Sequence, residues 1–298
     1  MVLKKIDAAA RLIGRYSSLF QCPVCGLAME MNENRTLLCR NRHGFDTAKP
    51  GYISLLTKAV KSDYGKTMFE ARNLVCRSGF FHPLIERIGE TILTNISGGG
   101  LKPVTVLDAG CGEGSQLAQL ADVWKRGTPA GFLGAGLDLS KEGVAIAARE
   151  YAGLIWCVGD LARSPFWDQS FDVILNVLSA SNYGEFTRLL RKDGMLIKVV
   201  PGSGHLRQLR DALYDDRSPR QAYSNDKTRA LFMRHFDMLD ERQIRYDVTL
   251  QKELLEPLVR MTPLSWGARD EQIQQALRLA IREVTADFTV LVGRAKVR

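Results

Sequence analysis

Three cysteines and a histidine near the amino terminus have the spacing of a metal site. Cys22, Cys25, Cys39 and His43 form the pattern Cys-x-x-Cys followed by Cys-x-x-x-His. Each half of this pattern is a turn that brings two ligands together, so the four side chains can surround one zinc ion tetrahedrally. Four protein ligands leave no position for water, and the pattern therefore predicts a structural rather than a catalytic metal. A disulfide between Cys22 and Cys25 is the alternative.

A glycine-rich segment further along the chain predicts a loop that binds a cofactor. It follows a predicted buried strand at 104–107 and precedes a predicted helix at 115–123. The segment is Asp108-Ala109-Gly110-Cys111-Gly112-Glu113-Gly114. Residues without a Cβ allow a ligand to lie against the main chain, and the helix start adds free N–H donors. The spacing G-x-G-x-G differs from the G-x-G-x-x-G of dinucleotide folds, and a glycine-rich turn without a ligand is the alternative.

This loop resembles the first motif of class I S-adenosylmethionine-dependent methyltransferases. The resemblance implies that the methionine end and the ribose of the cofactor lie over the loop. Its expected cofactor-binding residues are Asp108, Gly110, Gly112, Glu113 and Gly114. The resemblance also implies an α/β, Rossmann-like domain with a mostly parallel sheet of seven strands, preceded here by a small zinc-binding domain.

Acidic residues follow the next two predicted strands. Asp138 comes directly after the strand at 131–137, and Asp160 follows the strand at 155–158. Ligands of open α/β sheets bind beyond the carboxyl ends of the strands. We therefore expect Asp138 to accept hydrogen bonds from the ribose hydroxyls, and Asp160 to accept one from the adenine amino group. A helix N-cap is the alternative role for Asp138, and a turn residue is the alternative for Asp160.

Polar residues around the end of the fourth predicted strand, 173–178, are candidates for contact with the methyl acceptor. They are Asn176, Ser181 and Asn182, and the loop 179–183 faces the methyl group in this fold. Each could hydrogen-bond the edge of a base or be an ordinary polar loop residue. No residue in the sequence is an unambiguous general base.

A longer pattern around the zinc ligands narrows the resemblance to one family. After His43 runs Phe45-Asp46-x-Ala48-Lys49-x-Gly51-Tyr52-x-x-Leu55-Leu56. Shorter matches follow in Met68-x-x-Ala71-Arg72, Gly79, Pro83-Leu84, Pro201-Gly202, His205-Leu206, Met261-Thr262-Pro263 and Trp266. In their order and spacing these motifs resemble the bacterial large-subunit (23S) ribosomal RNA guanine-N1 methyltransferases.

The family resemblance implies S-adenosylmethionine as cofactor, methyl transfer to N1 of a guanine in a hairpin of large-subunit ribosomal RNA, and a homodimer. It implies that His205 contacts the cofactor near its methionine end and that Phe81 lies beside the cofactor. The chain departs from the family twice, because tyrosine is expected at Phe81 and proline at Ala180. The alternatives are methylation of transfer RNA or of a small molecule, and a non-catalytic RNA module that binds the cofactor.

The chain divides into four predicted segments. They are a basic N-terminal extension at 1–18, the zinc-binding domain at 19–57, a helical connecting region with a glycine joint at 58–100, and the methyltransferase domain at 101–298. Towards the end of the chain we expect a strand at 195–200 after an Asp193-Gly194 turn, a mainly helical stretch at 206–241, and strands at 244–250 and 288–292.

The overall charge favours an acidic partner. The formal net charge is +8, and nucleic acid is the first candidate for such a chain, with a solvated basic surface as the alternative. The basic residues singled out are Arg35, Arg40, Arg42, Lys49, Arg207, Arg210, Arg217, Arg220, Lys227, Arg229 and Arg234. Trp266 could stack on RNA, although a buried core position is expected. No run of about 18 apolar residues is present, so we expect no membrane span. Three of the six cysteines lie within Cys22 to Cys39 with no secretory segment before them, which favours a reduced cytoplasm.

Overall fold

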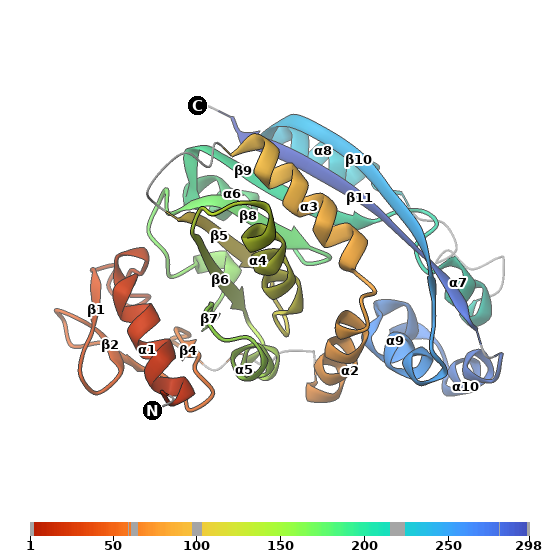
Figure 1. The fold of residues 1–298 in the computed structure, drawn as a ribbon, viewed down its shortest axis with the longest axis horizontal. Coiled ribbons are helices and arrows are strands. Elements are labelled where there is room, and N and C mark those ends of the chain that lie inside the picture. The colour runs from red at the N-terminus through yellow and green to blue at the C-terminus, as the bar shows by residue number, and fades with distance from the viewer. Residues whose placement is uncertain are drawn as a thin grey trace.

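A mixed sheet of eight strands forms the centre of the computed structural model, which describes residues 3–58, 60, 65–96, 103–214, 224–279 and 281–296. The strand order is β10-β11-β9-β8-β5-β6-β7-β4 (Figure 1). The parallel strands are β4 (Ile53–Ser54), β5 (Val104–Ala109), β6 (Phe132–Asp138), β7 (Ile155–Val158), β8 (Phe171–Val177) and β9 (Leu190–Pro201). The antiparallel strands β10 (Phe236–Thr249) and β11 (Glu283–Ala295) close the sheet beside β9.

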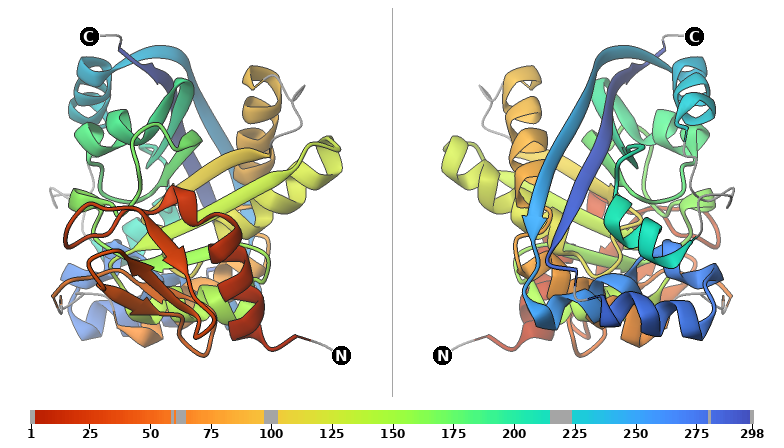
Figure 2. Two further views of the ribbon diagram at one scale, coloured as in Figure 1. Left: turned by 90° about the vertical axis from the view of Figure 1, so that its left-hand side faces the viewer. Right: turned by 90° about the vertical axis from the view of Figure 1, so that its right-hand side faces the viewer.

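Helices cover both faces of this sheet. On one face lie α3 (His82–Asn95), α4 (Ser115–Gly127) and α5 (Lys141–Glu150), and on the other lie α6 (Tyr183–Leu189) and α8 (Asp226–His235) (Figure 2). The strands are buried on both faces, so their side chains alternate between two cores. Val106 packs in the core that contains Leu120 and Trp124, whereas its neighbour Leu107 packs in the core that contains Phe186.

A group of helices lies at one end of the molecule. These are α2 (Lys66–Arg77), α7 (Arg207–Leu213), α9 (Leu255–Met261) and α10 (Asp270–Arg278), with the 3-10 turns η3 (Lys252–Leu254) and η4 (Pro263–Gly267) between them (Figure 1). Helix α2 packs against α9 and also touches α4 and α5. It thereby connects the C-terminal helices with the helices that follow β5 and β6.

The amino-terminal zinc lobe is joined to the large sheet. It consists of α1 (Lys5–Arg15), η1 (Ser17–Leu19) and an antiparallel sheet of β1 (Met29–Met31), β2 (Thr36–Cys39) and β3 (Gly44–Asp46). Strand β4 then leaves this lobe and pairs in parallel with β7, where Ile53 is opposite Cys157. Phe20 and Leu37 of the lobe share one core cluster with Phe166 of the methyltransferase domain.

Most of the predicted elements are present, and the differences have physical causes. The sheet contains the seven expected strands, but β4 adds an eighth because a two-residue strand leaves no periodic signal. The helical prediction over 206–241 is wrong beyond His235, since β10 begins at Phe236. Alternate residues of β10 are exposed, and their many charges resemble those of a solvated helix. The expected Asp193-Gly194 turn lies within β9, next to an irregularity in its pairing with β8.

Some predictions fall outside the described residues. These are the glycine joint at 97–100 and the basic residues Arg217 and Arg220. The glycine joint marks the predicted boundary before the methyltransferase domain, and the boundaries of all four segments remain predictions. Among the residues that the structure does describe, no helix combines the length and the apolar character needed to cross a bilayer.

Candidate cofactor and acceptor site

The glycine loop connects β5 to α4 at the carboxyl edge of the sheet. Gly110, Gly112 and Gly114 all have positive φ angles, of 86°, 56° and 84°. A Cβ at Gly110 would lie 2.7 Å from the Cβ of Ser179, and one at Gly114 would lie 2.6 Å from the Trp156 ring. The loop therefore needs glycine for its backbone conformation and for the close approach of neighbouring chain segments.

Asp108, the penultimate residue of β5, has a carboxylate without a hydrogen-bond partner in the described fold. Its side chain is 1% exposed, and neither carboxylate oxygen has a hydrogen-bond partner among the described residues. Burial raises the pKa of this carboxyl to about 7, and the positive charge of Arg72 partly opposes the shift. A buried carboxylate without donors costs free energy, so this position fits a ligand that brings a cation or a hydrogen-bond donor.

Asp138 holds the glycine loop from the neighbouring strand. One carboxylate oxygen, Oδ2, accepts a hydrogen bond from the Gly112 N–H at 2.9 Å, and Oδ1 accepts one from the Ser140 N–H at 2.8 Å. Desolvation by burial raises its pKa. The N-cap of α5 is Ser140, whose hydroxyl oxygen accepts from the Gly143 N–H. The alternative role of Asp138 as that cap is therefore filled by another residue.

Arg72 is a charged residue of the site whose role the sequence alone does not reveal. Its Nε lies 3.6 Å from Oε1 of the buried Glu113, and its guanidinium lies 5.8 Å from the centre of the Phe81 ring. The other oxygen of Glu113 accepts hydrogen bonds from Asn73 and Ser115, so Glu113 ties the loop to α2. The signal for Arg72 is the motif Met68-x-x-Ala71-Arg72, which contains the residue but gives no indication of its partners.

The rings of Phe81 and His205 both lie beside the Phe288 ring, and the Arg72 guanidinium lies over the Phe81 ring. The ring centres of Phe81 and Phe288 are 5.8 Å apart, and those of Phe288 and His205 are 4.7 Å apart. His205 Nδ1 also accepts the Asp287 N–H at 3.3 Å, and burial lowers the histidine pKa to about 4. The His205 ring is therefore neutral at physiological pH, and the observed partners of this ring lie on β11.

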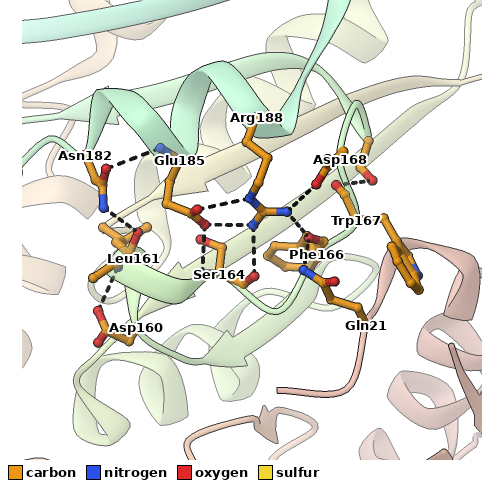
Figure 3. Close-up of polar contacts among 12 residues, drawn as sticks. Gln21, Asp160, Leu161, Ser164, Phe166, Trp167, Asp168, Asn182, Glu185 and Arg188 are labelled. Carbon is orange, nitrogen blue, oxygen red and sulfur yellow. Dashed lines mark hydrogen bonds and ion pairs between the residues drawn. The ribbon is translucent and has the colours of Figure 1, made fainter. Parts of the chain in front are cut away.

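Asp160 begins the turn η2 (Leu161–Arg163) after β7. Its Oδ1 accepts a hydrogen bond from the Ala162 N–H at 2.8 Å, as expected of a turn-forming aspartate, and the side chain is exposed. The segment after it is held by Arg188 of α6, which donates to the carbonyl oxygens of Ser164 and Phe166 (Figure 3). Gln21 of the zinc lobe donates to the same Phe166 oxygen at 2.9 Å.

Arg188 is itself fixed by carboxylates. It forms ion pairs with Glu185 at 2.7 Å and Asp168 at 2.8 Å, and Glu185 accepts a hydrogen bond from the Ser164 N–H at 3.0 Å (Figure 3). Asn182 donates from Nδ2 to the Leu161 carbonyl oxygen. The turn that carries Asp160 is thus connected on one side to α6 and on the other to the zinc lobe.

All three acceptor candidates have partners inside the protein. Asn176 is fully buried and donates from Nδ2 to the carbonyl oxygens of Ala109 and Ala180, at 2.8 and 2.9 Å. Its Oδ1 accepts from the Ser181 hydroxyl at 2.8 Å. Asn182 caps α6 by accepting the Glu185 N–H at 3.2 Å. Asn176 therefore shapes the loop, while Ser181 lies exposed beside it.

Lys198 is a second charged residue of the site whose role the sequence does not reveal, and unlike Arg72 it lies outside the motifs. It lies in β9, is 5% exposed, and donates from Nζ to Asn176 Oδ1 at 2.6 Å and to the Ser179 carbonyl oxygen at 2.5 Å. The available signal is a single lysine within the otherwise apolar run 195–200.

The predicted zinc ligands converge in the amino-terminal lobe. The ligand atoms of Cys22, Cys25, Cys39 and His43 all lie within 4.8 Å of one another, with 3.7 Å between the sulfurs of Cys25 and Cys39. Zn–S bonds of about 2.3 Å in a tetrahedron require edges of about 3.8 Å, so this spacing fits one structural zinc ion. All six cysteines are free, and the alternative disulfide between Cys22 and Cys25 is therefore not formed.

The expected basic surface is only partly available to a partner. Arg35 pairs with Asp7 at 2.9 Å, and Arg229 pairs with Glu241 at 2.7 Å. Arg210 is buried and donates to the carbonyl oxygens of Ser203 and His205. Arg40, Arg42 and Lys49 are exposed on the zinc lobe. The expectation of a buried Trp266 is wrong, because the residue lies in η4 and is 53% exposed.

Known proteins share both parts of this arrangement. The family model described as "RlmA, N-terminal" matches residues 20–62, and the model described as "Methyltransferase domain" matches residues 106–194. A Bacillus subtilis protein named "Putative 23S rRNA (guanine-N(1)-)-methyltransferase YxjB" is 42% identical over 93% of this chain and 97% of its own. The chain belongs to the 23S rRNA (guanine-N1)-methyltransferase family. The family member "23S rRNA (guanine(748)-N(1))-methyltransferase" of Streptomyces fradiae is 32% identical over 92% of this chain and 96% of its own.

Membership of this methyltransferase family confirms the enzyme class and the fold predicted from the motifs. It also confirms the two cofactors, S-adenosylmethionine and one structural zinc ion. The unsatisfied carboxylate of Asp108 and the converging cysteines and histidine are the features of this chain that fit these two groups.

Proposed function

We propose that this chain transfers a methyl group from S-adenosylmethionine to N1 of a guanine in a hairpin of large-subunit ribosomal RNA. The observation that carries the proposal is similarity to 23S rRNA methyltransferases along almost the whole chain, through both the zinc lobe and the methyltransferase domain. A relative of the methyltransferase domain alone would leave the acceptor open. We further propose a homodimer, as the family resemblance implies, and a cytoplasmic location, as expected from the cysteine pattern.

In the proposed cofactor complex, the carboxylate of Asp108 receives the methionyl ammonium. Asp138 accepts hydrogen bonds from the ribose hydroxyls, and Asp160 accepts one from the adenine amino group. The cofactor would lie against the main chain of the loop at Gly110, Gly112 and Gly114. Glu113 would hold the loop in place through its contacts with Asn73 and Arg72 of α2. We assign Arg72 to the methionyl carboxylate, because its Nε lies 3.6 Å from Glu113 of the glycine loop and its positive charge also acts on Asp108. Phe81 and His205 would line the methionine end.

In the proposed reaction the protein mainly orients the reactants. The cofactor supplies an electrophilic methyl carbon on a sulfonium, so the nucleophilic nitrogen must be held in line with it. Guanine N1 carries a proton that has to be lost, which requires a base or a site that stabilises the deprotonated ring. N1 lies on the Watson–Crick edge, and a paired guanine must therefore leave its helix to reach the loop after β8. Ser181 is the candidate exposed at this loop, while Asn176 and Asn182 would act by shaping it.

The decisive experiment maps the methylated atom. Purified protein is incubated with methyl-labelled cofactor and naked 23S rRNA, and reverse-transcriptase stops then locate Watson–Crick-edge methylation. We expect label in RNA and a stop at one hairpin guanine. Label in transfer RNA or in a small molecule would reassign the acceptor, and label that never leaves the cofactor would favour the non-catalytic module.

Asp138 provides a test of the cofactor assignment. Asp138→Ala should weaken binding of S-adenosylhomocysteine by about tenfold or more, because a charge-assisted hydrogen-bonded contact is lost. Calorimetry measures the change, and Asp122→Ala is the matched control because Asp122 is exposed on α4 and pairs with Lys125. An unchanged dissociation constant for Asp138→Ala would place the ribose elsewhere.

A further inference from the structure

Lys198 is a buried cation in the middle of the sheet. Strand β9 lies between β8 and β11, and the lysine side chain is 5% exposed. No described carboxylate forms an ion pair with it, and both of its observed partners are neutral oxygens. An unpaired buried charge is costly for a fold. Such groups are concentrated at functional sites, so the surroundings of this ammonium group indicate what it does.

The two partners of Lys198 connect the loops that hold the two reactants. The Ser179 carbonyl oxygen belongs to the loop after β8, and the side chain of Ser179 lies directly against Gly110 of the cofactor loop. Asn176, the other partner, donates to the carbonyl oxygen of Ala109, which immediately precedes Gly110. Lys198 is thus hydrogen-bonded to both groups that join the acceptor loop to the cofactor loop.

The same hydrogen bonds order the rest of the acceptor loop. Asn176 donates to the Ala180 carbonyl oxygen, and its Oδ1 is shared by Lys198 and the Ser181 hydroxyl. An ammonium donor makes shorter and stronger hydrogen bonds than a neutral donor. Burial lowers the pKa of Lys198 to about 8, which leaves the group charged at neutral pH.

We propose that Lys198 is a positioning residue for methyl transfer, whose ammonium group fixes Asn176 and Ser179 so that the acceptor loop is held over Gly110. The inference rests on the proposed function, since it concerns the loop that would receive the guanine. It assigns Lys198 no contact with either reactant. Loss of the residue should therefore affect turnover and the order of the loop more than cofactor affinity.

The test compares four variants of the full-length, zinc-loaded protein. Lys198→Met removes the donors, Lys198→Gln keeps a neutral donor, and Lys198→Arg keeps the charge. Lys192→Met is the matched control, because Lys192 is an exposed lysine of the same strand. For each variant we would measure kcat and KM with 23S rRNA, the dissociation constant of S-adenosylhomocysteine, and hydrogen–deuterium exchange at residues 178–182.

We expect Lys198→Met to lower kcat by about thirtyfold or more while the dissociation constant of S-adenosylhomocysteine changes by less than about threefold. Exchange in the loop should become about tenfold faster, Lys198→Arg should recover part of kcat, and Lys192→Met should behave as the wild type. If Lys198→Met does not fold, Lys198→Gln gives the same comparison, with a smaller fall in kcat.

Two results would overturn the inference. One is a substituted protein with wild-type kcat and wild-type loop exchange. The other is a parallel loss of cofactor binding, turnover and thermal stability, which would mark Lys198 as a general structural residue. If the wild type methylates no guanine, the proposed function fails on its own, and the exchange measurement in the S-adenosylhomocysteine complex still decides whether Lys198 orders the loop.

Discussion

At the scale of single residues, the carboxyl group of Asp108 makes the stability of the folded chain depend on pH. Its folded pKa is raised from 3.8 to about 7 by burial, so the folded chain retains a proton that the unfolded chain loses. Between these two values the unfolded state binds fewer protons, and the free energy of unfolding falls as pH rises. The stabilising contribution of the protonated carboxyl is complete below about pH 4 and is lost by about pH 7.

Asp108→Asn should remove this pH dependence, because the amide resembles the protonated carboxyl and cannot ionise. Without cofactor, the variant should melt a few degrees above the wild type at pH 8, and the difference should shrink at pH 5. Differential scanning fluorimetry at the two pH values measures this, with Asp122→Asn as the exposed control. The variant should bind S-adenosylhomocysteine about tenfold or more weakly at pH 8, since the ammonium loses its counter-charge. A melting difference independent of pH would contradict the prediction.

At the scale of secondary-structure elements, the sequence predicts the structure well where the signal is local. The unit of β5, the glycine loop and α4 can be recognised because an apolar strand, alternating glycines and a helix follow one another within one short stretch. The charged strand β10 resembles a helix in sequence because the charges on its exposed face hide the alternation of a strand. The roles of Arg72 and Lys198 depend on partners from distant strands and helices, which spacing along the chain does not reveal.

Gly110 and Gly153 have similar φ angles but different surroundings. Comparing alanine variants at the two positions therefore separates the cost of backbone strain from the cost of steric overlap. Gly110 has φ 86° and lies against Ser179, whereas Gly153 has φ 82° and no atom within 4 Å of the place that a Cβ would take. Gly153→Ala should therefore cost about 1 kcal/mol of unfolding free energy, from the left-handed backbone alone. Gly110→Ala should cost about 1–3 kcal/mol more, because Ser179 must move.

Urea denaturation of the two glycine variants measures the difference directly. Gly110→Ala should also weaken binding of S-adenosylhomocysteine, while Gly153→Ala should leave it unchanged, since Gly153 lies in the turn before β7. Equal losses of stability in the two variants would show that the contact between Gly110 and Ser179 is not tight.

At the scale of the whole molecule, the zinc lobe and the methyltransferase domain share one β-sheet and one hydrophobic core cluster. The lobe supplies β4 to the large sheet, its Phe20 ring lies 5.3 Å from the Phe166 ring, and Gln21 holds the Phe166 carbonyl oxygen. Because Arg188 binds that same oxygen, the lobe supports the segment that follows Asp160. Loss of the metal should therefore weaken cofactor binding.

Cys39→Ser should release the zinc ion and unfold the amino-terminal lobe, because a structural site contributes its binding energy to folding. The variant should also bind S-adenosylhomocysteine about three- to tenfold more weakly, since the turn after β7 loses support. Atomic absorption and calorimetry measure the two effects. Cys76→Ala is the control, because Cys76 is buried in α2 outside the metal cluster and should retain zinc. Zinc retained by Cys39→Ser would refute the ligand set, and unchanged cofactor affinity in the zinc-free variant would refute the coupling.

The pairing of β4 with β7 also has a consequence for how the nascent chain folds. During translation Ile53 leaves the ribosome well before its partner Cys157, because the glycine loop, α4, β6 and α5 are synthesised between them. Closing so long a loop makes this pairing a late event. The ligands can capture zinc early, but Phe20 and Leu37 find the rest of their core only when β7 and the segment after it have emerged. We therefore expect metal loading to precede docking, with an open strand edge on the newly made lobe until β7 is available.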